Sequence, residues 1–183
     1  MTQRPIGPAS SADPPTPLGS VAPPLPATDK RRDPVPCGDF DMRIARDGTW
    51  FYHGSPIGRK PLVKLFASVL GRDDDGAYWL TTPAERGRIA VDDAPFVAVE
   101  VDAVGDGRAQ TLRFRTNLDD VVTSDTDHPI RVSHDVETGE PSPYVLVRDR
   151  LEALIARSVY YQLVDLGVEE AVDGVRQYGV WSE

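Results

Sequence analysis

A polar run between residues 116 and 135 contains the side chains best suited to chemistry. Its members are Thr116, Asn117, Asp119, Asp120, Asp125, Asp127, His128, Arg131, His134 and Asp135. Carboxylate oxygens suit Mg²⁺ or Ca²⁺ and imidazole suits Zn²⁺, so a divalent metal site is one interpretation. The run lacks the EF-hand spacing, and the chain has no His-Glu-x-x-His pair. Asp and Asn before apolar residues also serve as turn and N-cap residues, so a purely structural role is the second interpretation.

Arginines spread along the chain form a second set of candidates. They are Arg59, Arg86, Arg88, Arg113, Arg115, Arg131 and Arg148. Guanidinium groups that converge on one cleft bind phosphate or carboxylate through paired hydrogen bonds. Arginines on the wet face of a hairpin instead pair with nearby carboxylates and contribute little. Spacing does not distinguish the two arrangements.

The chain contains no complete catalytic set. It has no Gly-x-x-x-x-Gly-Lys-Ser/Thr loop, and Ser55 and Ser68 lack the glycines of a nucleophile elbow. Cys37 has no catalytic partner in evidence. The aromatic residues Trp50 and Trp79 can stack on a base, although aromatics at this frequency mostly form core. The residues therefore favour no enzyme class and indicate no cofactor.

Composition sets the broad class of the protein. The chain has 183 residues, of which 40% are hydrophobic, with a formal net charge of −9 and one cysteine. This length and apolar content suffice for a real core, and the negative charge disfavours a nucleic acid polymer as partner. One cysteine gives no disulfide framework and is typical of the cytoplasm. No run reaches 18 apolar residues and no signal peptide is evident, so we expect a cytoplasmic protein without a membrane span.

The chain divides into a tail and two halves. Residues 1–36 are rich in Pro with Ser, Ala and Thr, and we expect a disordered tail there. Folding is expected to start near Cys37, with an N-terminal β/α half over residues 37–95 and a C-terminal half over residues 96–183. The predicted fold class is α+β.

The secondary structure prediction starts from a strand, helix, turn, strand unit over residues 48–80. Leu62, Val63, Leu65, Phe66, Val69 and Leu70 form one apolar helical face, with Gly71 as the expected stop. Asp47-Gly48 predicts a hairpin between residues 41–45 and 49–53. Further strands are predicted at residues 78–80, 86–91, 96–102, 110–116, 130–134 and 178–181. A second helix is predicted from the stripe Leu151, Leu154, Ile155, Val159 and Leu163, ending at Gly167.

Two segments suggest an internal repeat. Residues 59–67 align with residues 148–156 at a constant offset, with Arg, two Leu and Ala matching. Amphipathic helices also resemble one another by chance, so duplication and coincidence both stay open. If the repeat is real, each half is a β-rich unit with one helix, and the seam between the halves is the natural cleft.

Several of these stretches together resemble the bacterial family DUF1285. They are residues 50–57, residues 62–66, Thr116-Asn117 and residues 127–132. The resemblance covers about residues 37–181. It implies a duplicated β-rich core, a C-terminal half similar to pleckstrin-homology domains, a nucleotide-like ligand at the seam, and a role in signal transduction. It also implies that Thr116, Asn117, His128 and Arg131 lie near that seam.

The leading hypothesis is a cytoplasmic small-ligand-binding or sensor protein for an anionic, nucleotide-based ligand. Arg59 and Arg131 are the predicted anion partners, Asn117 and His128 the hydrogen-bonding groups, and Trp79 a stacking wall. The alternative is a metal-dependent hydrolase that uses the acidic cluster from Asp119 to His128. A third hypothesis is an interaction module whose exposed strand or tail docks a partner.

Overall fold

The computed structural model describes residues 35–105, 109–172 and 175–179, and defines only the backbone at Pro36, Cys37 and from residue 169 onward. The first strand starts at Val35, two residues before the predicted start of the fold. The remainder of the predicted tail, residues 106–108, and the end of the strand predicted at 178–181 lie outside the described residues.

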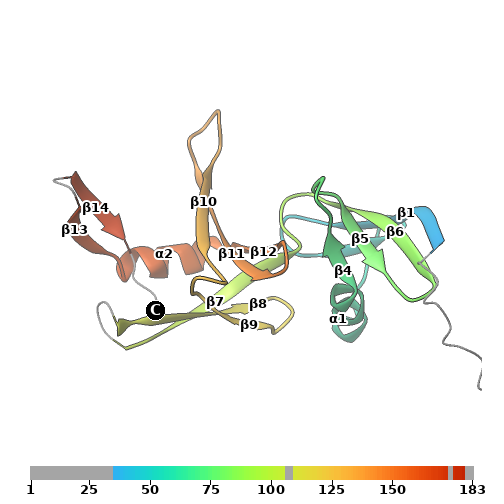
Figure 1. Ribbon diagram of the computed structural model, residues 1–183, viewed down its shortest axis with the longest axis horizontal. Coiled ribbons are helices and arrows are strands. Elements are labelled where there is room, and N and C mark those ends of the chain that lie inside the picture. Colours follow the sequence, from blue (N-terminus) through green and yellow to red (C-terminus); the bar gives the residue numbers. More distant parts are fainter. Residues whose placement is uncertain (1–34, 106–108, 173–174, 180–183) are drawn as a thin grey trace, which may run out of the picture. The chain divides into compact units, whose positions relative to one another are not determined.

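Two six-stranded sheets contain twelve of the fourteen strands in the described part of the chain (Figure 1). The N-terminal sheet has the order β3-β2-β1-β6-β5-β4 and the C-terminal sheet the order β10-β11-β12-β7-β8-β9. A two-stranded sheet, β13-β14, follows. The elements are β1 (Val35–Ile44), β2 (Trp50–Tyr52), β3 (Ser55–Pro56), α1 (Lys60–Ser68), β4 (Leu70–Arg72), β5 (Tyr78–Thr81), β6 (Glu85–Val91), β7 (Phe96–Val104), β8 (Thr111–Thr116), β9 (Val121–Thr123), β10 (Ile130–His134), β11 (Pro141–Arg148), β12 (Leu151–Ile155), α2 (Arg157–Asp165), β13 (Val168–Val172) and β14 (Val175–Gly179).

The two large sheets share one topology. Each consists of two antiparallel three-stranded meanders, and its first strand pairs in parallel with its last, β1 with β6 and β7 with β12. The prediction of two β-rich halves is therefore confirmed. The helices are not equivalent, because α1 lies between the third and fourth strands of the N-terminal sheet, whereas α2 follows the sixth strand of the C-terminal sheet.

For residues 59–67 and 148–156, where the sequence left duplication and coincidence open, the structure favours coincidence. The first segment is largely the helix α1, whereas the second contains the strand β12. The shared topology instead matches β1 with β7 and β6 with β12. In this correspondence the acidic loop at residues 124–129 takes the place that α1 has in the N-terminal half.

The predicted helix through Leu151 is wrong in its first part. Leu151, Ala153 and Ile155 are buried with a period of two, as in a strand covered on one face, and the helix begins only at Arg157. Val159 and Leu163 are buried on α2 as predicted. The first helix ends at Ser68, three residues before the predicted stop, since Gly71 already lies in β4.

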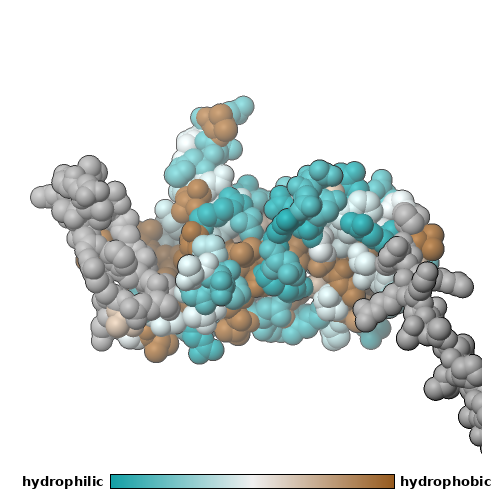
Figure 2. Space-filling model, viewed as in Figure 1, coloured by the Kyte–Doolittle hydropathy of each residue, from teal (hydrophilic) through white to brown (hydrophobic). Residues whose placement is uncertain are grey.

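The core is one continuous cluster that spans both sheets. Trp50 and Phe66 stack with centroids 6.3 Å apart, and Val63 and Ala67 of α1 pack into the same cluster. Phe96, Phe114, Leu112, Val145 and Leu151 are its largest fully buried members from the C-terminal half. The helix therefore covers the N-terminal sheet, while the β10–β11 hairpin carries exposed apolar residues toward its end, such as the fully exposed Val136 (Figures 1 and 2).

In the part of the chain that the structure describes, no helix has the length and apolar content needed to cross a membrane.

Candidate functional site

Asn117 links the two halves, and Thr116 holds the loop in which Asn117 lies. The Asn117 Oδ1 atom accepts a hydrogen bond from the Val97 backbone N–H at 3.1 Å, and its Nδ2 donates to the Gly48 carbonyl at 3.4 Å. Thr116 is 1% exposed, and its Oγ1 accepts from the backbone N–H groups of Leu118 and Asp120. Both side chains hold the loop between β8 and β9, and Asn117 also lines a cavity of about 200 Å³.

Asp119 forms two ion pairs across the seam. Its carboxylate lies 2.7 Å from the Lys60 Nζ atom and 2.8 Å from the Lys64 Nζ atom, both on α1, and 3.7 Å from an Arg115 nitrogen. The hydrogen bonds from Lys60 and Lys64 lower the pKa of Asp119 from 3.8 to about 2. These three cations neutralise the Asp119 carboxylate, and the two lysines link the β8–β9 turn to α1.

Acid should weaken this seam. Because the folded-state pKa of Asp119 lies below 3.8, its stabilising effect is present above that pH and is lost as the pH falls through about 2. We expect Asp119→Asn to lower the unfolding midpoint at about pH 6, and the gap from wild type to shrink between about pH 4 and about pH 2. Urea unfolding of both proteins across this pH range measures the difference in midpoint. Asp75→Asn, which removes an exposed carboxylate with no ion pair to a described residue, is the control. A gap that is constant with pH would contradict the role of Asp119.

Trp79 is held by polar neighbours on two sides. Its Nε1–H donates to Asp73 at 2.7 Å, and the Arg86 guanidinium lies 4.3 Å from the ring centroid. The hydrogen bond from Trp79 lowers the pKa of Asp73. Arg86 thus covers a face of the ring that was predicted to stack on a ligand. Arg59 is exposed at the N-cap of α1, where its carbonyl accepts from Leu62 and Val63.

His128 anchors the loop that precedes β10. Asp125 Oδ1 accepts the backbone N–H groups of Asp127 and His128 at 2.9 and 2.8 Å, and the His128 Nδ1 atom lies 3.1 Å from the same oxygen. These hydrogen bonds, first of all that from the His128 backbone, lower the pKa of Asp125. Within the described ranges, no group of three or more His, Cys, Asp or Glu side chains is placed to hold a metal ion.

Arg131 lies at the seam in a fixed orientation. Its guanidinium forms a bidentate pair with Glu152 at 2.5 and 2.6 Å and stacks over the Tyr144 ring, 4.1 Å from the centroid. The hydrogen bonds to Glu152 raise the pKa of Arg131. A planar cation held between a carboxylate and a ring is pre-organised for a second planar or tetrahedral anion.

A cavity of about 580 Å³ opens beside Arg131 between the two halves. The N-terminal half contributes Arg72, Asp73, Asp74 and Gly76, and the C-terminal half contributes Arg131, Leu146, Asp149, Arg150 and Glu152. Arg150 pairs with Asp74 across it, and Arg72 donates to the Gly76 carbonyl at 3.3 Å.

Of the six candidate residues named from the sequence, Arg131 is the one that lines this cavity. Arg72 and Arg150, which come from turns on opposite sides of the seam, were not among those candidates. The charged triplet at residues 148–150 was visible in the sequence, but it was interpreted as the start of a helix. The structure instead makes it a tight turn, in which Asp149 has a φ of 47°.

Two sheets of one topology that meet at a polar seam define a two-domain, β-rich protein. The chain belongs to the DUF1285 family: the model for its N-terminal domain, described as a domain of unknown function, matches residues 27–94, and that for its C-terminal domain matches residues 95–183. No curated protein matches the chain.

Two crystal structures of DUF1285 family proteins are similar to this chain. The protein from Silicibacter pomeroyi DSS-3 is 52% identical, with a TM-score of 0.75 over 82% of this chain and 79% of its own. The protein from Shewanella baltica OS155 is 26% identical, with a TM-score of 0.53 over 68% of this chain and 91% of its own. The resemblance noted in the sequence is therefore confirmed at the level of the family.

Proposed function

We propose that the protein is a cytoplasmic sensor that binds a small anionic, nucleotide-based ligand in the cavity beside Arg131. The observation that carries this proposal is the convergence of Arg72, Arg131 and Arg150, from both halves, on one space of about 580 Å³. That volume lies within the range of small-molecule sites, about 300–1,000 Å³, and such sites commonly lie between domains.

The charges of the cavity favour a ligand of mixed character. Four carboxylates line it beside the three guanidinium groups: Asp73, Asp74, Asp149 and Glu152. A simple inorganic anion would meet repulsion from these carboxylates. A nucleotide offers phosphate oxygens to the arginines and sugar hydroxyl or amino donors to the carboxylates, so both kinds of group find partners.

The arrangement also supports signal transmission. A ligand bound here contacts the β4–β5 turn of one half and the β11–β12 turn of the other. Its binding free energy therefore depends on the relative orientation of the two halves. The Arg150–Asp74 pair is exposed on both sides and exchanges partners at little cost. In this proposal Thr116 and Asn117 act by holding the seam, and no ligand contact is assigned to Arg59, Trp79 or His128.

The proposal includes a C-terminal half that resembles pleckstrin-homology domains. Support comes from the order of elements, because the last antiparallel meander, β10-β11-β12, leads directly into α2. The cytoplasmic location rests on the single cysteine.

Replacing Arg150 tests the function. We expect one or more nucleotides to stabilise the full chain against heat, by about 2.7 kcal/mol at a 100-fold excess over Kd. Arg150→Met should weaken this binding about tenfold, because a charge-assisted hydrogen bond is lost, while an exposed ion pair contributes little to folding. Differential scanning calorimetry and isothermal titration calorimetry measure the two effects.

Arg157→Met is the matched control, since Arg157 also forms an exposed pair, with Glu140, but does not line this cavity. The proposal fails if no nucleotide stabilises the protein, if inorganic phosphate stabilises it equally, or if both arginine variants bind like the wild type.

A further inference from the structure

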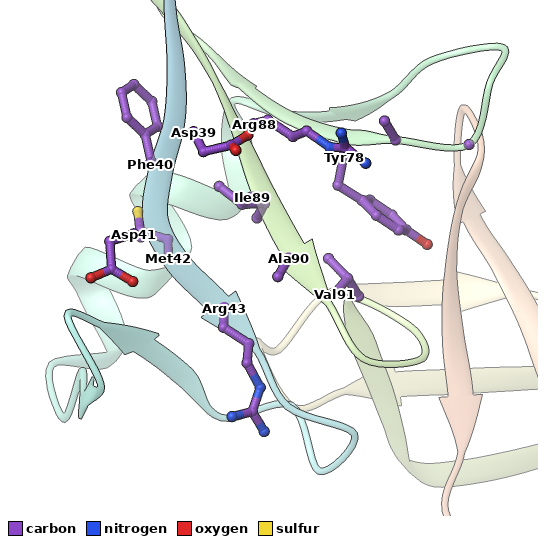
Figure 3. Close-up of a pocket in the computed structure, with 12 residues that line it drawn as sticks. Asp39, Phe40, Asp41, Met42, Arg43, Tyr78, Arg88, Ile89, Ala90 and Val91 are labelled. Atoms are coloured by element: carbon purple, nitrogen blue, oxygen red, sulfur yellow. The ribbon is translucent and has the colours of Figure 1, made fainter.

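A second cavity, of about 720 Å³, lies within the N-terminal sheet (Figure 3). It opens where β1 and β6 lose their regular pairing. Asp39 is the register partner of Arg88, but the next partners are Arg43 and Ala90, so β1 advances four residues while β6 advances two. Such bulges release backbone groups from the ladder and re-aim side chains, and they are frequent beside binding sites.

Packing beneath the bulge fixes its geometry. A Cβ atom at Gly87 would overlap the ring of Phe40, so this ring lies directly on the β6 backbone. Met42 and Ile89 are buried in the core next to it. The widened stretch of β1 is therefore held by the core on one face, and the cavity is a built feature of the sheet.

Two of the four charged residues lining this cavity have ion-pair partners. Arg43 donates to Asp92 at 2.8–3.1 Å, and Asp41 lies 2.7 Å from the His53 ring. The other two, Asp39 and Arg88, form no ion pair with each other or with any other described residue.

Asp39 and Arg88 stay apart although they are register partners. Figure 3 shows the Arg88 side chain extended away from Asp39, with its guanidinium toward Tyr78. A carboxylate and a guanidinium thus line one cavity at separate positions, and neither has an ion-pair partner among the described residues. The apolar groups that complete the lining include Tyr78, Ala90 and Val91.

We propose that this cavity binds a free apolar α-amino acid. The carboxylate of the ligand pairs with the Arg88 guanidinium, its ammonium group pairs with Asp39, and its side chain packs against Tyr78 and the apolar wall. A zwitterion offers a partner to each of these two charges at once, which a simple anion or cation does not. This site is independent of the nucleotide proposal.

Isothermal titration calorimetry of the full chain with L-leucine and L-phenylalanine tests the inference. We expect saturable binding of at least one of them. N-acetyl-L-leucine, which lacks the ammonium group, and L-leucinamide, which lacks the carboxylate, should each bind at least about tenfold more weakly than L-leucine. If L-phenylalanine is the ligand that binds, N-acetyl-L-phenylalanine and L-phenylalaninamide should be weaker than L-phenylalanine by the same factor.

Matched variants locate the binding. Arg88→Met and Asp39→Asn should each weaken binding at least about tenfold. Arg113→Met and Asp75→Asn remove exposed charges that lie outside this cavity, and should bind like the wild type. The inference is overturned if neither amino acid binds at about 10 mM, well above the range of specific small-molecule sites. It is also overturned if the blocked ligands bind equally well, or if the Arg88 and Asp39 variants retain wild-type affinity.

Discussion

Replacing Phe96 by alanine should lower the free energy of unfolding by about 3–5 kcal/mol, the usual cost of removing a buried aromatic ring. Phe96 is 0% exposed at the start of β7. The Arg148 guanidinium stands 5.1 Å from its ring centroid and donates to the Ala67 carbonyl at 2.6 Å. Loss of the ring therefore removes core volume and also the surface that orients a cross-seam hydrogen bond. Urea unfolding monitored by tryptophan fluorescence measures the change.

Val99→Ala in the same strand is the control, because Val99 is 40% exposed. It should cost less than about 1 kcal/mol. Phe96→Leu keeps much of the apolar volume and should fall between the two variants. A cost below about 1 kcal/mol for Phe96→Ala would contradict the placement of this ring in the core.

Gly48→Ala is expected to destabilise the protein by about 2–4 kcal/mol. Gly48 has a φ of 82°, where an L-residue costs about 1–2 kcal/mol. An added Cβ atom would also overlap the Asn117 amide and lie 3.2 Å from Val97 Cγ2. The substitution thus disturbs the hydrogen bonds by which Asn117 joins the two sheets, and calorimetric unfolding should show it.

Gly54→Ala separates these two causes. Gly54 has a similar φ of 74°, but an added Cβ atom meets nothing within 4 Å. We expect it to cost only about 1 kcal/mol. Equal costs at the two glycines would mean that the contact with Asn117 contributes nothing.

Local chemistry predicted the local features of this fold. Asp47-Gly48 marked the β1–β2 hairpin, and the structure places the Gly48 N–H on the Ala45 carbonyl at 2.9 Å. The apolar stripe from Leu62 predicted α1 over two turns. These elements depend on contacts between residues close in sequence, which the spacing of residue types records.

Nonlocal pairing decided the element that the sequence misassigned. The stretch from Leu151 to Ile155 satisfies both a helical and an alternating pattern over its short length. Its pairing with β7, through Leu154 and Val97, is made to residues more than fifty positions away. No pattern within the stretch reveals that partner.

The candidate site was only partly predictable for the same reason. The residue types were visible, and Arg131 was identified. Its partner Glu152 is 21 residues away, and the cavity also needs Arg72 and Asp74 from the other half. For Asp125 and His128, the structure shows the loop-anchoring contacts that the sequence had offered as the structural interpretation.

The parallel pairing of the first and last strand in each sheet has a consequence for synthesis on the ribosome. Translation delivers β1 long before β6, and β7 long before β12, so each sheet stays open at its centre until its sixth strand has emerged. Neither sheet can be completed without its own sixth strand. A nascent polypeptide that stalls between Arg72 and Glu85 would leave β1 with one unpaired side, a template for pairing with another chain.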